Sequence, residues 1–309
     1  MKRKKYKGLC VIDSVYTFFL FVLINIRDYK EFFYVFWVNM PMWIAEKLPN
    51  KLLLWDSYVA ISDPNNFMEN WRYKLRFYWI MTKFRLWGLQ ACGQGHLPFS
   101  RCLLNYTNKS FEEYEDGTGS YYHVEEVIND RLKRRICAAD AEPTFGFSKK
   151  VKRVYLTDEN MPVPEKIAKK AHFVDLKKIW ETMSEKERAE VKELFQMSNV
   201  SLGKDVDTIV LTRPYSEDRM CTEEEKIEKL REILKTTVLS RVTIKPHYRE
   251  RTDYKAVFPD VNVIEGKFPV ELYMLMSGEG IKRFITYGEC SAEHFIKRYY
   301  PEVEYKRVD

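Results

Sequence analysis

The segment Thr208-Ile-Val-Leu-Thr212 and the chain that follows it decide the fold. Its β-branched and aliphatic residues predict a short buried strand. A helical pattern comes next over 222–235, with Thr222 as the N-cap, three glutamates in the first turn and an apolar stripe. A second β-rich run, Arg241-Val-Thr-Ile-Lys245, then follows. A strand, a helix and a strand in this order predict a parallel β-sheet.

The same alternation extends over the rest of the chain, although the first half is less regular. Further strands are expected at 7–13, 31–38, 89–92, 111–114, 261–264 and 282–287. Further helices are expected at 15–27, 71–87, 122–136, 269–276 and 292–300. Strands that alternate with helices throughout indicate an α/β protein built on parallel sheets.

The chain of 309 residues is long enough for two domains. Two segments lie between the two regular halves. They are Asn160-Met-Pro-Val-Pro164, whose prolines favour a loop, and a charged helical stretch at 175–197. We therefore expect a linker region at about 156–200. The predicted domains are an N-terminal Rossmann-like domain over 1–155 and a C-terminal one over 156–309.

Composition narrows the class of protein. A net charge of +6 with 31% charged residues indicates a well-solvated surface, but a nucleic-acid binder usually concentrates basic charge more strongly. We expect no nucleic-acid partner and a mild attraction to anionic substrates. The six cysteines form no Cys-x-x-Cys pair and several lie in apolar runs, which favours buried reduced thiols over disulfides or zinc.

The N-terminal segment has features of a signal peptide, because basic residues 2–5 precede an apolar stretch at 15–26. Asp13 and Ser14 interrupt this pattern, and no small-residue cleavage site follows. We favour a first strand and helix, and hence a cytoplasmic location. The basic and aromatic residues of 71–87 leave peripheral contact with the inner face of the membrane open. A half-buried helix with solvated cations is the simpler interpretation.

Two acids stand where a predicted strand ends, in Glu115-Asp116-Gly117-Thr118. Neighbouring side chains on a strand point in opposite directions, so one carboxylate can face substrate while the other holds the loop. A general base must lie within hydrogen-bond reach of the proton it removes, and a second carboxylate nearby can raise its pKa. The alternative is an acidic turn without chemistry.

Lys245-Pro246-His247 ends a strand in the second half. Proline cannot continue the ladder, so His247 is placed at the carboxyl end of a parallel strand, where α/β folds bind ligands. Ser291 at a helix N-terminus suits a phosphate, and Glu271 suits ribose hydroxyls. A cleft between the two halves would then hold a base on one wall and an imidazole on the other. Each of these residues also has a plain structural alternative, such as an N-cap or a surface histidine.

Together these segments resemble bacterial lipooligosaccharide sialyltransferases, glycosyltransferase family 52, which are related to bacterial polysialyltransferases. Glu115-Asp116-Gly117 resembles the acid-acid-Gly motif and Lys245-Pro246-His247 the His-Pro motif. Cys290-Ser291 falls at the place of a Ser/Thr pair, and Phe268-Pro-Val-Glu271 resembles a ribose-binding segment. Gly93-Gln94-Gly95-His96-Leu97 and Leu211-Thr212-Arg213-Pro214 resemble further recurring segments. Three positions depart from the pattern, namely Tyr248 for proline, Cys290 for a hydroxyl residue and Arg213 for glutamine.

The resemblance implies a GT-B-like fold with two Rossmann-like domains whose sheets face across a cleft. It implies metal-independent, inverting transfer from CMP-sialic acid to a terminal galactose, as an α-2,3 linkage on a lipooligosaccharide or capsule. The N-terminal domain would bind the acceptor and the C-terminal domain the donor. Asp116 would be the base, with Glu115 as the second choice, and His247 would assist the departing phosphate. Implied donor contacts are Lys245, Glu271, Ser291, Cys290, Thr212 and Arg213. Implied acceptor contacts are Gly117, Thr118, Gln94 and His96.

The resemblance implies no metal or other cofactor. Asp205-Val206-Asp207 has the form of an Asp-x-Asp metal motif, but it precedes a strand instead of following one, which argues against a metal role. The expected partners are CMP-sialic acid and a galactose-terminated glycan, and a homodimer stays open. Two alternatives also stay open. One is a related transferase that uses another sugar nucleotide, and the other is a non-catalytic module that binds membrane or nucleic acid through 71–87.

Overall fold

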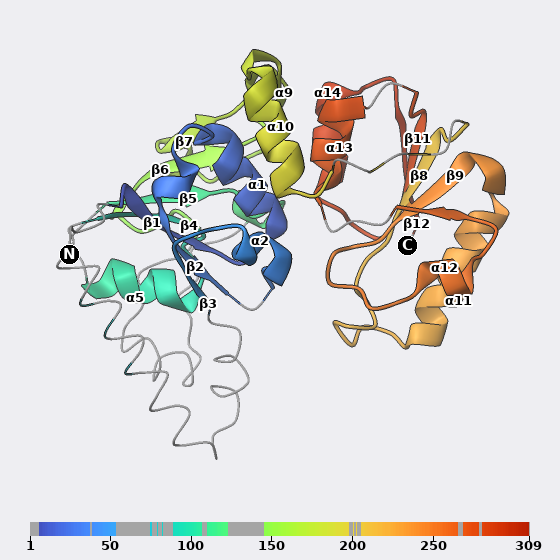
Figure 1. Ribbon diagram of the computed structural model, residues 1–309, viewed down its shortest axis with the longest axis horizontal. Coiled ribbons are helices and arrows are strands. Elements are labelled where there is room, and N and C mark those ends of the chain that lie inside the picture. The colour runs from blue at the N-terminus through green and yellow to red at the C-terminus, as the bar shows by residue number, and fades with distance from the viewer. Residues whose placement is uncertain are drawn as a thin grey trace. The chain divides into compact units, whose positions relative to one another are not determined.

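The computed structural model describes residues 6–37, 39–53, 75, 79, 82, 89–106, 110–122, 145–197, 200, 202, 205–264, 268–277 and 280–308. The chain forms two compact units, Met1–Ile179 and Trp180–Asp309. Each unit contains its own parallel sheet, which confirms the predicted α/β class with two Rossmann-like units (Figure 1). Among the described helices, none combines the length and the apolar character needed to cross a bilayer.

The sheet of the first unit has the order β3-β2-β1-β4-β5-β6-β7, and its pairs are parallel. Its strands are β1 (Gly8–Ile12), β2 (Phe33–Phe36), β3 (Lys51–Leu53), β4 (Gln90–Gly93), β5 (Phe111–Tyr114), β6 (Val151–Leu156) and β7 (Ala171–Phe173). Its helices are α1 (Val15–Ile24), α2 (Met42–Glu46), α5 (Pro98–Tyr106), α6 (Gly119–Tyr122) and α8 (Glu165–Ala168), with a 3-10 turn η1 (Tyr29–Glu31).

Helices cover both faces of this sheet because its strands β1 and β2 are apolar on both sides. Leu9 and Val11 join the core cluster that includes Phe99 of α5. On the other face, Phe18 of α1 meets the Tyr34 ring edge-on, with ring centroids 5.8 Å apart. Helix α1 is apolar on all sides, as expected for a buried helix. Its first turn is capped by the Ser14 hydroxyl, which accepts a hydrogen bond from the Thr17 amide.

The sheet of the second unit has the order β10-β9-β8-β11-β12 and is also parallel. Its strands are β8 (Thr208–Leu211), β9 (Val242–Lys245), β10 (Asn262–Val263), β11 (Arg283–Tyr287) and β12 (Glu304–Val308). Its helices are α10 (Glu185–Leu194), α11 (Glu223–Lys235), α12 (Tyr254–Val257), α13 (Val270–Ser277) and α14 (Ala292–Tyr299), with a 3-10 turn η2 (Leu239–Arg241). Helix α9 (Leu176–Thr182) contains the boundary between the units.

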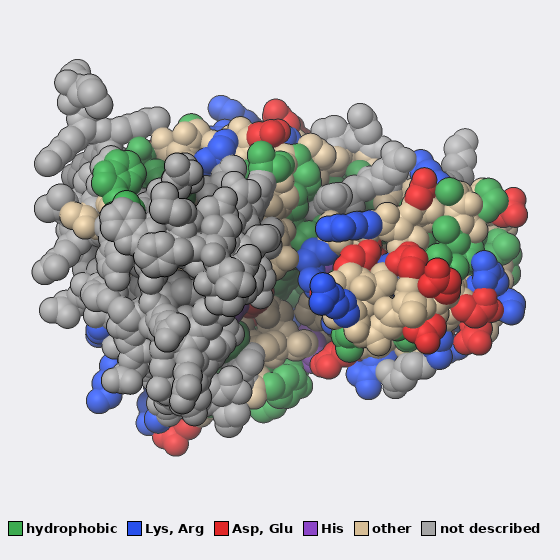
Figure 2. Space-filling view, turned by 90° about the horizontal axis from the view of Figure 1, so that it is seen from below, with side chains coloured by type: hydrophobic (Ala, Val, Ile, Leu, Met, Phe, Trp, Pro, Cys, Tyr) green, Lys and Arg blue, Asp and Glu red, His purple; other side chains and the backbone are tan. Residues whose placement is uncertain are grey.

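In the second unit, α11 and α12 pack on one face of the sheet and α13 and α14 lie on the other (Figure 1). Leu230, Ile233 and Leu234 of α11 contact the same core as Val210 and Ile244. The predicted N-cap is confirmed, since Thr222 and Glu225 form a capping box at the start of α11. Both signs of charge are interspersed over the face of this unit that Figure 2 shows.

The first unit runs beyond residue 155, where the first domain was expected to end. Strand β6 continues to Leu156, and β7 pairs with it through Val154 and Ala171. The division at Ile179 falls inside the expected linker region. Sequence analysis missed β3, β6, β7 and β12. The predicted helix 71–87 and most of the predicted helix 122–136 lie outside the described residues.

Each sheet has a place where neighbouring strands send their connections in opposite directions. In the first unit this place lies between β1 and β4, and in the second between β8 and β11. The crevice beyond the carboxyl ends of such strands is where open α/β sheets bind ligands. All the site residues predicted from the sequence lie at or after carboxyl ends of strands or stand in the first turn of the next helix.

Candidate active site

Glu115 stands directly after β5 and is almost fully enclosed, at 5% exposure. Its two oxygens accept hydrogen bonds from the Tyr16 hydroxyl at 3.0 Å, the Tyr121 hydroxyl at 2.7 Å and the Thr157 amide at 2.6 Å. The Thr157 hydroxyl adds a contact at 2.8 Å. Burial raises the pKa of Glu115, while the hydrogen bonds from Tyr121, Thr157 and Tyr16 oppose this rise. This carboxyl therefore ties β5 to α1, α6 and β6.

Asp116 is the more accessible acid of the pair, with 30% of its side chain exposed. Its own amide donates to the Ser120 hydroxyl at 2.8 Å, which fixes the turn into α6. Its carboxylate lies 3.5 Å from the Thr17 hydroxyl and 3.5 Å from Nε2 of His96. The two acids therefore differ in accessibility as the alternation of a strand requires, and Asp116 is the one that a substrate can reach.

The segment after β4 forms the neighbouring part of this edge. His96 stacks on Phe145, with ring centroids 4.6 Å apart and an angle of 9° between the planes. Gln94 is buried at 1% exposure, and its side-chain carbonyl accepts from the amides of Asp13 and Ser14. Gln94 therefore holds the turn between β1 and α1. Its predicted role as an acceptor contact does not fit this burial.

Gly117 and Thr118 form the turn between Asp116 and α6. Gly117 has a φ of +61°, which glycine adopts readily, and its carbonyl accepts from the Ser120 amide. Thr118 is half-buried in the same turn. Both residues lie beside Asp116, and their acceptor contact stays a prediction.

Glu113 is a functional candidate that sequence analysis missed. It lies on β5 with 3% exposure, and one carboxyl oxygen accepts from the Gly95 amide at 2.7 Å. Burial, aided by the charge of Asp116, raises its pKa to about 8. A side chain at Gly95 would collide with this carboxyl, which accounts for glycine there. The alternation of β5 places Glu113 on the same face as the buried Phe111, a signal that was present in the sequence.

His247 follows β9 in the second unit. Its amide donates to Glu250 at 2.7 Å and to the Thr212 hydroxyl at 3.3 Å. Burial lowers the pKa of its imidazole to about 3, and the cationic groups of Arg249, Lys245 and Arg213 add to this effect. Nδ1 accepts from the Arg249 amide at 3.3 Å. The neutral ring therefore carries its proton on Nε2, where it can donate to a ligand oxygen.

Lys245 is the last residue of β9 and is buried. Its ammonium donates to the Pro246 carbonyl at 2.9 Å and lies 4.6 Å from the centre of the Phe268 ring. Burial lowers its pKa to about 8, while the charge of Glu271 opposes the shift. Glu271 is itself buried in the first turn of α13. A buried cation and a buried carboxylate therefore belong to the same edge of this sheet.

Arg213 and the segment 288–291 meet where β8 and β11 diverge. The Arg213 guanidinium donates to the Glu289 carbonyl and lies 5.2 Å from the centre of the Tyr215 ring. Ser291 is the N-cap of α14, and its exposed hydroxyl makes no capping hydrogen bond. Burial raises the pKa of the Cys290 thiol to about 11, so this thiol is neutral. A cation and a helix N-terminus therefore share this edge with His247.

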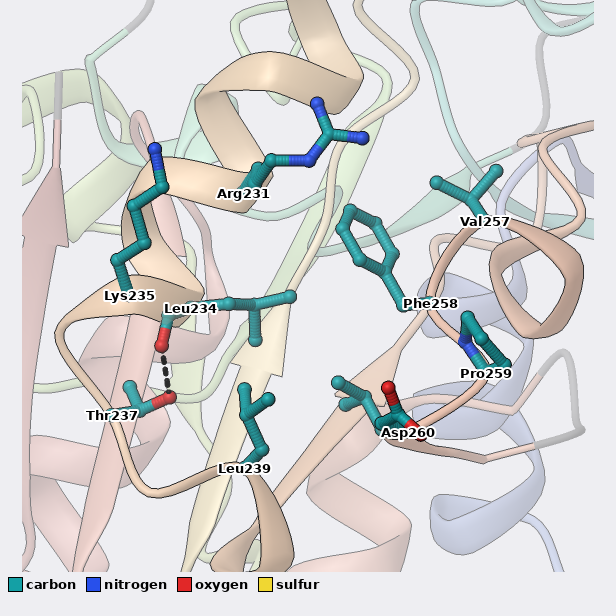
Figure 3. A pocket seen from close by; sticks show the side chains of 10 residues that line it. Arg231, Leu234, Lys235, Thr237, Leu239, Val257, Phe258, Pro259 and Asp260 are labelled. Atoms are coloured by element: carbon teal, nitrogen blue, oxygen red, sulfur yellow. Dashed lines mark hydrogen bonds between the residues drawn. The ribbon is translucent and has the colours of Figure 1, made fainter.

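Other features of the second unit lie at the opposite, amino edge of its sheet. Asp207 precedes β8 and pairs with Arg241. Within the described part of the chain, no group of three or more potential metal ligands is found. A hollow of about 420 Å³ lies between the end of α11 and residues 257–261 (Figure 3). None of the predicted site residues lines this hollow.

Comparisons with known proteins bear on the family and the fold of this chain. Residues 95–295 match the model of glycosyltransferase family 52. An uncharacterized protein of Haemophilus influenzae is 30% identical over 300 residues, which cover 94% of this chain and 92% of the relative. A crystal structure of an α/β-galactoside α-2,3-sialyltransferase from Photobacterium phosphoreum superposes with a TM-score of 0.54 and 13% identity. That alignment covers 97% of this chain and 89% of the other.

A UDP-GlcNAc 2-epimerase from Neisseria meningitidis, solved with bound UDP-GlcNAc, is more distant. It gives a TM-score of 0.48 at 10% identity, over 93% of this chain and 78% of that one. The fold is thus that of GT-B glycosyltransferases, as the resemblance implied. The chain belongs to glycosyltransferase family 52.

Proposed function

We propose that this protein is an inverting sialyltransferase. It transfers sialic acid from CMP-sialic acid to a terminal galactose hydroxyl, as an α-2,3 linkage, on a bacterial lipooligosaccharide or capsule. Family membership supports a glycosyl transfer, and the relative from Photobacterium phosphoreum carries an α-2,3-sialyltransferase activity on the same fold. The enzyme needs no metal and contacts the membrane, if at all, only peripherally.

The contrast between Glu115 and Asp116 is the single observation that carries this proposal. Glu115 is enclosed by hydrogen-bond donors, whereas the Asp116 carboxylate is accessible beside His96. Asp116 takes the proton of the acceptor hydroxyl as the new bond to the anomeric carbon forms. The bond between the anomeric carbon and the phosphate oxygen breaks in the same step. One displacement inverts the anomeric centre.

The second unit offers complementary groups for the departing CMP. The neutral imidazole of His247 donates from Nε2 to the phosphate, and the Arg213 guanidinium and the α14 N-terminus at Ser291 add positive potential. Lys245 contributes a further cation, and Cys290 stays a neutral thiol. Thr212 holds the His247 amide, and Glu271 accepts from the ribose hydroxyls.

A donor panel tests this proposal. The purified protein is incubated with lactose and, separately, CMP-sialic acid, UDP-galactose, UDP-GlcNAc and GDP-mannose, and products are identified by mass spectrometry. We expect a sialylated trisaccharide from CMP-sialic acid alone, and its cleavage by an α-2,3-specific sialidase. Turnover of a different nucleotide sugar would show that CMP-sialic acid is not the donor. Inactivity with every donor, together with salt-sensitive binding to anionic vesicles or oligonucleotides, would favour the non-catalytic alternative.

A further inference from the structure

We propose that Glu250 is a positioning residue for the donor side of the site. It holds the His247 segment and the Thr212 hydroxyl in the arrangement that transfer requires. The inference rests on the proposed function only for the step in which His247 meets the departing phosphate. It assigns to Glu250 a role that no motif in the sequence indicates.

Three hydrogen-bond donors converge on the Glu250 carboxylate. The His247 amide donates to Oε2 at 2.7 Å, and the Thr212 hydroxyl donates to the same oxygen. The Tyr254 hydroxyl donates to Oε1 at 2.6 Å. The side chain of Glu250 is only 1% exposed. Because His247 follows β9 and Thr212 follows β8, this carboxylate joins the ends of two neighbouring strands.

A buried ammonium balances the charge of Glu250. Nζ of Lys226, on α11, lies 3.6 Å from Glu250, 3.2 Å from Glu217 and 3.0 Å from Glu223. Burial alone would lower the pKa of Lys226, but these carboxylates raise it, so the group stays charged. Glu217 also accepts from the Arg251 amide at 2.7 Å. The ion cluster therefore anchors the segments after β8 and β9 to α11.

The chemistry at position 250 calls for a group that only accepts hydrogen bonds. An ionised carboxylate can take all three donors as well as the ammonium, whereas the NH₂ group of glutamine would face one of those donors. The Thr212 hydroxyl gives its proton to Glu250, which leaves a lone pair to accept from the His247 amide. The backbone of His247 is thus held from two sides. Displacement of a catalytic group by about 1 Å can cost about 10²-fold in rate.

The chain provides a matched control in Glu223. This residue also contacts Lys226, but its hydrogen bonds go to the Ser216 and Thr252 hydroxyls, at 2.6 and 2.5 Å. Glu223→Gln therefore weakens the same ion cluster without removing an acceptor from His247. Glu250→Gln removes the charge and leaves one acceptor oxygen where the carboxylate has two, and Glu250→Asp keeps the charge while shortening its reach. The aspartate variant serves as the second test if the glutamine variant fails to fold.

Steady-state kinetics with CMP-sialic acid and lactose test the proposal in the chain of 309 residues. We expect Glu250→Gln or Glu250→Asp to lower kcat by about 10²-fold, with a much smaller change in the donor KM and with the donor affinity largely retained. The kcat of Glu223→Gln should stay close to that of the wild type. In a His247→Ala background, Glu250→Gln should add little further loss, since the two residues act as a unit.

Equal losses in the Glu250 and Glu223 variants would overturn the proposal. So would an undiminished effect of Glu250→Gln in the His247→Ala background. A second readout does not depend on activity, namely the ¹⁵N NMR signals of the His247 ring, which report the tautomer. We expect Glu250→Gln to change these signals and Glu223→Gln to leave them. A wild-type enzyme without CMP release would contradict the proposed function, while unchanged ring signals in Glu250→Gln would contradict the positioning role.

Discussion

Glu115 and Asp116 are neighbouring carboxylic acids at the end of β5, yet their surroundings differ, and the proposed function gives them different roles. For Asp116→Asn we expect transfer to fall by about 10²–10⁴-fold, the usual contribution of a general base. The fold should persist because this side chain is partly exposed and has few structural contacts. Initial rates and circular dichroism on the same preparation check both expectations.

For Glu115→Gln we expect the main effect on the stability of the fold instead of on the chemical step. Its carboxylate accepts from Tyr16, Tyr121 and Thr157, and an amide cannot accept at both ends. We expect a loss of about 1–3 kcal/mol in the free energy of unfolding. A chemical denaturation series measures it. A stable Glu115→Gln enzyme without activity, beside an active Asp116→Asn enzyme, would reverse the two assignments.

Glu113 should make the stability of the protein depend on pH. Its folded-state pKa is raised from 4.5 to about 8 by burial. The folded state therefore holds a proton that the unfolded state has lost, and stability falls as pH rises from about 4.5 to about 8. Glu113→Gln mimics the protonated form, so its stability relative to wild type should be greater at pH 9 than at pH 5. Thermal unfolding at the two pH values tests this, and a constant difference would contradict it.

At the scale of elements, the turn between β5 and α6 carries Asp116, the proposed base. The Ser120 hydroxyl accepts from the Asp116 amide at 2.8 Å, and Ser120 is buried. Ser120→Ala should cost about 1 kcal/mol of stability and, through displacement of Asp116, up to about 10²-fold in kcat. Ser120→Thr keeps the hydroxyl and serves as the control. Comparable activity in the alanine and threonine variants would mean that the turn holds Asp116 without this contact.

The regularity of each element decides how well the sequence predicts it. Strands β8, β9 and β11 are apolar runs between clear turn signals, and α11 has a capping box, so all four were predicted. Strand β12 is rich in charged residues because it lies at an edge of its sheet, with one face toward solvent. Strand β7 has three residues, also at an edge. Such strands depend on pairing with a neighbour more than on their own composition.

The molecule as a whole joins residues that lie far apart in the sequence, and this limits prediction from sequence. The motifs around Asp116 and His247 follow the carboxyl ends of strands, which an alternating pattern predicts. The partners Glu113 and Glu250 were not predicted. Glu113 meets an amide 18 positions away, and Glu250 meets a hydroxyl 38 positions away. The alternation of β5 places Glu113 on a buried face, but no local pattern in a single sequence encodes which group each carboxylate contacts.

Transfer by the whole enzyme should not require a divalent metal. In the proposed mechanism, His247, Arg213 and the α14 N-terminus stabilise the negative charge on the departing phosphate. A divalent metal ion would do the same in a metal-dependent enzyme. Dialysis against EDTA should leave the rate of CMP release unchanged, and added Mg²⁺ should not raise it. A loss of activity in EDTA that Mg²⁺ restores would show that these residues do not suffice.

The most direct test of the central claim is CMP release from CMP-sialic acid, measured with and without lactose for the wild type and for Asp116→Ala. Release should rise when lactose is present, because the acceptor hydroxyl is the nucleophile, and this lactose-dependent part should disappear in the variant. Such a result would establish both the donor and the base. An absence of release by the wild type, or equal lactose-dependent release by the variant, would contradict the account.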